Sequence, residues 1–292
     1  MNQPVNITII GERINPGFKS SRALFDNEDI EGIQQLAKNQ MEKGAKYLNI
    51  NVGEKALTNR NFLVEVIKAI QNVVSIPLSF DFPNKDVQET CLKTYLPEKA
   101  GGQKPIMNSV SDLRLDMLDL IKIQPFKAIL MASERIEDGV PKRNEDSENI
   151  YKTARNLSLK ILQEYEGFSP DDLLIDVSVG PIGGGAIKTP VNAIRQIGSD
   201  KDLKGIHITV GLSNIGVMLP RHAADDSLLK WQVESSFLTL AIPLGLDTIL
   251  ATAGSKYFIL PDDNFVFHII KESMEFDGLD AVMHIRKLYH KG

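Results

Sequence analysis

Short amide and carboxylate side chains stand directly after several apolar runs of this chain, where they would line a common pocket. They are Asn49, Asn51, Asp81, Asn108, Asp176, Ser213 and Asn214. A carboxylate accepts two hydrogen bonds side by side, and an amide both donates and accepts. Such a set suits a planar heterocycle with an N–H edge, such as a 2-amino-4-oxo pyrimidine, and it suits a polyphosphate poorly.

Each of these residues also has a simpler explanation. A single Asp or Asn after a strand usually forms a turn or caps the next helix. The same applies to Ser213 and Asn214, which open a loop containing Pro220 and Arg221. Five apolar runs that all end this way favour one shared pocket over five independent turns. Asn214 is then expected to be the working residue of that pocket.

Eight short apolar runs are expected to be the strands that position these side chains. They are Ile7–Ile10, Tyr47–Gly53, Pro77–Asp81, Pro105–Asn108, Ala128–Met131, Leu173–Asp176, Ile206–Thr209 and Thr248–Leu250. The polar stretch Glu12–Ser21 is expected to follow the first strand, and a polar loop through Gly139–Lys142 is expected to follow the fifth.

Helices are predicted between and after these strands, because apolar residues recur there three and four positions apart. They cover about 26–41, 61–71, 85–95, 112–122, 147–165, 190–197, 227–242, 263–274 and 280–289. Alternating strands and helices imply a parallel sheet, and eight such units favour a closed barrel. The predicted fold class is α/β, a (β/α)8 TIM barrel forming a single domain over residues 1–292, with the polar side chains at its C-terminal face.

Composition excludes several classes of function. The net charge is -5 and no Lys/Arg-rich block is present, so nucleic acid is not an expected partner. Cys91 is the single cysteine, which excludes an intramolecular disulfide and a multi-thiolate zinc site. No apolar stretch approaches the roughly 20 residues that span a bilayer, and residues 1–4 show no signal-peptide pattern. We therefore expect a cytoplasmic protein that binds no membrane and no metal.

Other catalytic motifs are mostly missing. The run Gly183–Gly185 lacks the Lys-Ser/Thr ending of a P-loop, and a mobile lid is the better interpretation of the glycine-rich loop Gly180–Lys188. There is no Gly-x-Ser-x-Gly or His-Glu-x-x-His sequence, and the five histidines have no metal-like spacing. A glycosidase using Asp81 and Asp176 as paired carboxylates would leave the amides unexplained.

Six segments resemble the pterin-binding barrels, and within them the methyltetrahydrofolate:corrinoid methyltransferases. They are Ile10-Gly11-Glu12-Arg13-Ile14-Asn15, Leu48–Gly53, Phe80-Asp81 with Asn84, Met107-Asn108-Ser109, Leu174-Ile175-Asp176 and Gly211-Leu212-Ser213-Asn214. They occur in the family's order over roughly residues 7 to 250. The sequence departs from the family at Phe82-Pro83, in the Gly180–Lys188 loop and over Ile215–Arg221.

The resemblance implies roles for individual residues. Asp81, Asn108 and Asp176 match residues that hold the pterin ring, and Asn214 matches the amide near N5 of the folate. Asp81 also belongs, by this resemblance, to the network that shares the N5 proton. The further pterin or folate contacts in the matching segments are Asn51, Asn84 and Ser213. Arg221, in the stretch that departs from the family, aligns with a folate contact of the family.

The implied reaction moves a methyl group between N5 of 5-methyltetrahydrofolate and the cobalt of a corrinoid (cobalamin). Either direction is open, including the tetrahydrofolate-methylating step of a demethylase system. The corrinoid is expected on a partner protein, because the chain lacks an Asp-x-His-x-x-Gly cobalamin signature, and the family implies a homodimer.

Two alternatives stay open. One is a dihydropteroate synthase-like enzyme, with Lys188 or Arg221 near a diphosphate leaving group, although its basic Arg-x-His motif has no counterpart here. The other is a non-catalytic pterin-binding subunit.

Overall fold

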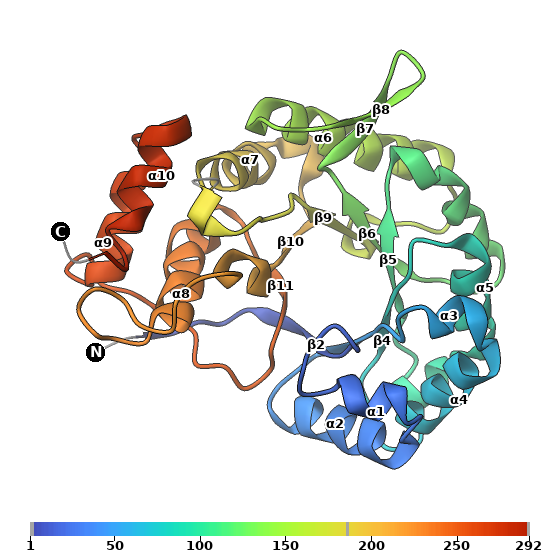
Figure 1. Ribbon diagram of the computed structural model, residues 1–292. Coiled ribbons are helices and arrows are strands. Elements are labelled where there is room, and N and C mark those ends of the chain that lie inside the picture. The colour runs from blue at the N-terminus through green and yellow to red at the C-terminus, as the bar shows by residue number, and fades with distance from the viewer. Residues whose placement is uncertain (1–2, 185–186, 291–292) are drawn as a thin grey trace.

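The computed structural model describes residues 3–184 and 187–290, and its centre is a closed barrel of parallel strands (Figure 1). The eight barrel strands are β2 (Thr8–Ile14), β3 (Tyr47–Ile50), β4 (Leu78–Asp81), β5 (Ile106–Val110), β6 (Lys127–Met131), β9 (Leu173–Asp176), β10 (His207–Gly211) and β11 (Thr248–Ala251). They are neighbours in chain order, and β11 pairs with β2 to close the ring. The prediction of a single-domain (β/α)8 barrel is confirmed.

Helices surround the barrel, as Figure 1 shows. They are α1 (Arg22–Asp26), α2 (Ile30–Glu42), α3 (Lys55–Thr58), α4 (Arg60–Gln71), α5 (Lys85–Thr94), α6 (Ser147–Glu164), α7 (Lys188–Ser199), α8 (Leu229–Ala241), α9 (Phe265–Ser273) and α10 (Gly278–Arg286). Side-chain oxygens of Asn59, Asp146 and Asn264 accept hydrogen bonds from backbone N–H groups in the first turns of α4, α6 and α9, which fixes where these helices begin. None of the helices in the described ranges is both long and apolar enough to cross a membrane.

The helix predicted over Asp112–Lys122 is confirmed in its bounds; it is a 3-10 helix (η2), and Arg114 interrupts it with φ -140° and ψ 38°. Two other local predictions were wrong. The expected loop through Gly139–Lys142 is a hairpin of β7 (Glu134–Glu137) and β8 (Val140–Arg143). Its turn is Asp138-Gly139, both at positive φ, the dipeptide that best suits a two-residue hairpin. The first strand extends to Ile14, so Glu12 belongs to β2 and not to a polar loop.

An apolar layer fills the inside of the barrel below its polar end. Ile10, Ile106, Ile129 and Leu174 form one buried cluster. Side chains two positions apart along a strand point to the same face. Asn108 and Asp176 therefore point into the barrel above Ile106 and Leu174, and the apolar layer is the floor of the space between them.

The register brings the polar strand ends to one level. Asp81 is paired with Asn108, and Met131 with Asp176, across their neighbouring strands. The C-terminal ends of β4, β5, β6 and β9 thus lie along one edge of the barrel, as predicted from the sequence.

Candidate functional site

The ends of β3, β4 and β5 form one hydrogen-bonded wall, which we call the amide wall (Asn49, Asn51, Asp81 and Asn108). Asn49 Nδ2 and Asn51 Nδ2 both donate to Asp81 Oδ2, at 3.0 and 3.3 Å. Asn49 Oδ1 accepts from Ser79 Oγ at 3.0 Å and from Asn108 Nδ2 at 3.4 Å. Among the described residues, none is bonded to Asp81 Oδ1. That oxygen is available to accept a hydrogen bond from a ligand.

Burial controls the charge of Asp81. It raises the pKa of the carboxyl, while the donated hydrogen bonds from Asn49 and Asn51 lower it in part. The two amides thus stabilise a carboxylate in a poorly hydrated place. A ligand N–H group aimed at Oδ1 would add a third such donor.

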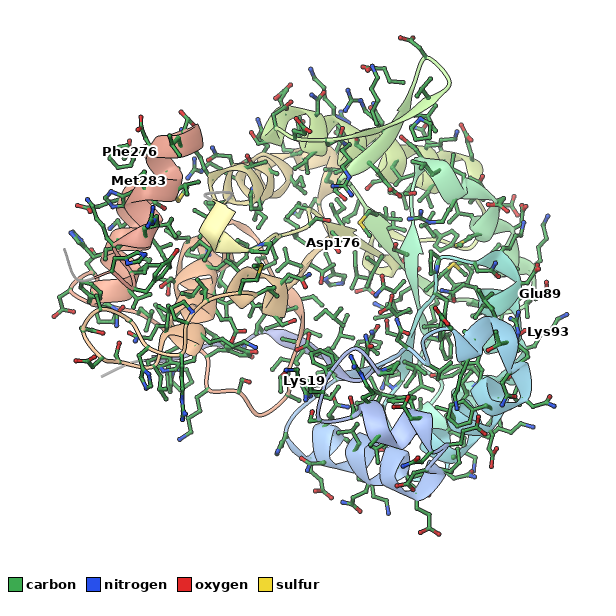
Figure 2. The ribbon with its side chains drawn as sticks, viewed as in Figure 1. Lys19, Glu89, Lys93, Asp176, Phe276 and Met283 are labelled. Carbon is green, nitrogen blue, oxygen red and sulfur yellow. The ribbon has the colours of Figure 1, made fainter. Side chains whose placement is uncertain are left out.

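Asp176 provides a second acceptor, across the barrel mouth from the amide wall. It points toward the middle of the barrel (Figure 2). Its Oδ1 accepts from the backbone N–H of Ser178 at 2.7 Å. Burial raises the pKa of this carboxyl to about 6, and the hydrogen bond from Ser178 only partly opposes the rise.

Asn214 lies beyond the strand, on a 3-10 helix, η6 (Leu212–Gly216), that directly follows β10. Its side chain is exposed and has no hydrogen-bond partner in the described part of the chain. A Cβ at Gly211 would come within 2.9 Å of Asn214 Nδ2, so glycine there leaves room for this amide. Asn214 is thus a free amide at the mouth of the barrel.

Glu12 holds this part of the mouth together. It lies on β2, only 4% exposed. Its Oε2 accepts from Ser213 Oγ at 2.8 Å, and its Oε1 accepts from Thr252 Oγ1 at 2.7 Å. Burial raises the pKa of Glu12, against these two hydrogen bonds. Ser213 is thus fixed by Glu12, and Asn214 is held through its neighbour.

Glu12 has no role predicted from the sequence, because it falls in the stretch Glu12–Ser21 that was expected to be a polar loop. An acid inside an apolar strand would have been the signal. A second buried acid, Glu234 on α8, lies in the same region and is 5% exposed. Burial raises the pKa of Glu234 to about 7; the nearby Glu12 carboxyl adds to the rise and Lys230 opposes it.

Gln88 is a second supporting residue that sequence reasoning missed. This fully buried side chain on α5 donates through Nε2 to the carbonyl oxygens of Phe80, Phe82 and Asn108, at 2.8, 2.9 and 3.3 Å. It ties the ends of β4 and β5 together and so fixes the spacing within the amide wall.

Three predicted contacts have no hydrogen bond to the amide wall among the described residues. Asn84 is exposed and caps α5, with its Oδ1 accepting from Val87 N at 3.0 Å. Arg221 lies after η6 and lines a cavity together with Arg13. Lys188 Nζ bonds Asp277 Oδ1 at 2.8 Å, at the start of α10. Of the glycine-rich loop, Ile182–Gly184 forms a short 3-10 helix, whereas Gly185 lies outside the described residues.

Metal ligation finds no support in the described ranges. Across residues 3–184 and 187–290, no three His, Cys, Asp or Glu side chains are grouped so that they could hold a metal ion. The site consists of carboxylates, amides and an apolar floor.

Comparison with known proteins identifies the family of the chain. Residues 12–250 match the pterin-binding enzyme family. The chain belongs to that family. The match begins at Glu12 and ends at Leu250, so it includes every predicted site residue of this pterin-binding barrel.

Individual relatives of this pterin-binding enzyme are distant. This chain is 25% identical to a methylcorrinoid:tetrahydrofolate methyltransferase of Eubacterium limosum over 262 residues, which cover 85% of this chain and 86% of the relative. Solved dihydropteroate synthases share the fold. That of Thermus thermophilus has a TM-score of 0.57 at 16% identity, covering 92% of both chains. That of Clostridium difficile, determined in the presence of pteroic acid, has a TM-score of 0.57 at 19% identity over 100% of both chains.

Proposed function

We propose that this pterin-binding enzyme transfers a methyl group between N5 of a folate and the cobalt of a corrinoid carried on a partner protein. The observation that supports the proposal is the free amide of Asn214, held at the mouth of a pocket whose other walls are carboxylates and amides. The Eubacterium limosum relative is named for transfer from a methylcorrinoid to tetrahydrofolate, which agrees with this chemistry. The site has no directional element, and a catalyst lowers the barrier both ways.

Binding of the pterin would use the two carboxylates. The 2-amino group and ring N–H of a pterin form a donor edge that matches the acceptors of a carboxylate. Asp176 and Asp81 Oδ1 are the acceptors that the described chain leaves open toward the cavity, and the amides of Asn51 and Asn108 flank them. The apolar layer beneath, with Ile106 and Leu174, gives the flat ring a surface to rest on.

The reaction is limited by the leaving group. When the N5–methyl bond breaks, N5 keeps the electron pair, and a proton on N5 makes the product a neutral amine instead of an unstable anion. The corrinoid supplies the cobalt that exchanges the methyl group with N5. The Asn214 side chain would stabilise N5 through its oxygen if N5 carries a proton, or through its NH2 group if it does not.

Asn214 needs no acid beside it in this scheme. The proton can come from solvent through a water, or through a hydrogen-bonded network that includes Asp81. The barrel mouth must stay open for this chemistry, because the corrinoid arrives with its own protein. The homodimer remains part of the proposal.

A spectroscopic assay tests the proposal. Purified protein is mixed with 5-methyltetrahydrofolate and reduced cobalamin, and conversion to methylcobalamin is followed by absorbance. We expect turnover that Asn214→Ala lowers by about 100-fold or more and that Lys93→Ala, on the outer face of α5, leaves unchanged. Absence of turnover together with tight folate binding would instead support the non-catalytic subunit. Formation of a pterin–aminobenzoate product from a pterin diphosphate would support the synthase alternative.

A further inference from the structure

A second cavity lies beside η6, and we call it the side cavity. Its volume is about 730 Å³, and its lining includes Arg13, Arg221, Lys230, Trp231, Thr252 and Tyr257. These residues come from the end of β2, the segment after η6, the first turn of α8 and the segment after β11. The side cavity is therefore built from the strands that flank Asn214, on the opposite arc of the barrel from β4 and β5.

The side cavity is continuous with the wall that carries Asn214. Gly216, the last residue of η6, lines it. Thr252, another lining residue, donates to Glu12, and Glu12 accepts from Ser213 next to Asn214. The side cavity thus adjoins the segment that carries Asn214.

The charges in the side cavity suit an anion. Arg13, Arg221 and Lys230 bring three cationic groups to its lining. Among the described residues that line it, the one acid is Glu234, whose Oε1 lies 3.8 Å from Lys230 Nζ. Arg221 is exposed, and its side chain has no ion-pair partner within the described chain. Arg13 stacks on the Phe18 ring at 4.1 Å, and its Nη2 donates to Ser20 Oγ. Arg13 is thus partly engaged within the protein, and Arg221 is the lining cation most available to a ligand.

Aromatic groups add a preference for a flat ligand. Trp231 and Tyr257 both line the side cavity, and Trp231 is held edge-on against Phe258 with 6.0 Å between ring centroids. A rigid indole gives a planar group a large contact area at little cost in side-chain entropy. The lining thus combines a place for a ring with a place for carboxylates.

The covalent structure of a folate determines where its tail lies relative to N5. C6, which carries the tail, is bonded directly to N5, and the pyrimidine edge lies at the other end of the bicycle. If N5 faces Asn214, the tail must leave on the η6 side. We propose that the side cavity binds the aminobenzoyl-glutamate tail of the folate, with Arg221 and Lys230 selecting tails that carry additional glutamate carboxylates. This inference rests on the proposed function.

Calorimetric titrations test tail binding in the side cavity separately from pterin binding in the barrel mouth. The ligands are 6-methyltetrahydropterin, which lacks the tail, and 5-methyltetrahydrofolate with one and with three glutamates. The variants are Arg221→Gln, Lys230→Gln and the double variant, with Lys93→Gln on α5 as the matched control, far from the side cavity (Figure 2). Trp231 is the single tryptophan of the sequence, so its fluorescence gives an independent signal from the side cavity.

We expect the triglutamate to bind more tightly than the monoglutamate, and more so at low salt. Each cavity variant should weaken triglutamate binding by about 3- to 10-fold, the range for a lost partner of an exposed or charged hydrogen bond. The same variants should leave the Kd of 6-methyltetrahydropterin unchanged, which also shows that they are folded.

Two results would overturn the inference in different ways. If the variants bind all three ligands as the wild type does, the tail lies elsewhere and only the side cavity assignment fails. If the wild type binds none of them, the proposed function itself fails and the tail site fails with it. Equal weakening of tail-less and tailed ligands would show that Arg221 and Lys230 act on the pterin pocket as a whole.

Discussion

The amide wall and the η6 side of the barrel mouth are organised in opposite ways. In the amide wall, the functional side chains bond one another, so their positions are set before any ligand arrives. On the η6 side, the functional amide of Asn214 bonds nothing in the described chain, and the ordering is supplied beneath it by Glu12. The first arrangement suits binding of a ring that does not change. The second suits a group that must respond to a changing charge at N5.

The largest expected effect on the rate of methyl transfer comes from replacing Asn214. Asn214→Ala should lower the rate of methyl transfer by about 100-fold or more, because the amide stabilises N5 mainly in the transition state. Folate affinity should fall much less, and the free energy of unfolding should be unchanged, since the side chain is exposed. Rapid-mixing kinetics and titration of the same preparation give both numbers. Unchanged turnover would remove Asn214 from the mechanism.

Replacing Asp81 should give the opposite pattern. Asp81→Asn keeps the shape but loses the charged acceptor, and we expect pterin affinity to fall by about 10- to 100-fold, the range for a hydrogen bond to a charged group. The rate at saturating folate should change less than in Asn214→Ala. A variant that lost rate at saturation but bound folate normally would contradict the division between the two regions.

Acidification should act on Asp176. The folded-state pKa is raised to about 6 from an ordinary value of 3.8. Between these values Asp176 holds its proton in the folded protein and loses it in the unfolded chain, so its contribution to the free energy of unfolding should fall as pH rises from about 4 to 6 and should then level off. Asp176→Asn should remove this part of the slope, whereas the part that comes from Glu234, whose pKa is raised to about 7, should remain. Pterin affinity of the wild type should weaken below about pH 6, because the protonated carboxyl loses an acceptor.

Glu12→Gln tests the support beneath Asn214. A carboxamide has only one oxygen, so it can accept a hydrogen bond from only one of Ser213 and Thr252. Its NH2 group then faces the other hydroxyl. We expect about a 10-fold loss in rate, equal to the roughly 1.4 kcal/mol of one hydrogen bond, with little change in pterin affinity. A structural role alone would lower the free energy of unfolding and leave the rate of the folded enzyme intact.

Asn84 gives the smallest expected effect. Loss of its cap in Asn84→Ala should lower the free energy of unfolding by about 1 kcal/mol. If capping is its whole role, pterin affinity stays the same, and Asn84→Asp, which keeps the cap, restores the free energy of unfolding. Weaker pterin binding in both variants would return Asn84 to the folate contacts that the sequence resemblance implies.

Short-range patterns explain which features the sequence could predict. Each barrel strand is an apolar run with a turn after it, so the ends at Asp81, Asn108 and Asp176 were visible along the chain, and the parallel fold brings them to one edge. The hydrogen bonds that organise Asn49, Asn51 and Asp81 join residues about 30 positions apart on neighbouring strands. Their proximity followed from the fold class.

The η6 side depends on contacts that no local pattern encodes. Glu12 meets Ser213 and Thr252, which are 201 and 240 positions away. The 3-10 helix after β10 also looked like an ordinary continuation of the loop. The Asp138-Gly139 hairpin is different, since its turn dipeptide was present in the sequence and its flanking residues were too polar to suggest strands.

Glu12 bonds residues that lie far away in the sequence, and this has a consequence for the synthesis of the enzyme. A ribosome releases the residues of the amide wall within the first 110 or so positions, in a segment that already contains β3, β4 and β5. The partners of Glu12 emerge only with β10 and the segment after β11, when the first strand can meet the last. During synthesis, the amide wall is thus complete before Asp176 follows on β9, and well before the group that acts on N5 is held in place. The enzyme becomes competent only when the barrel closes.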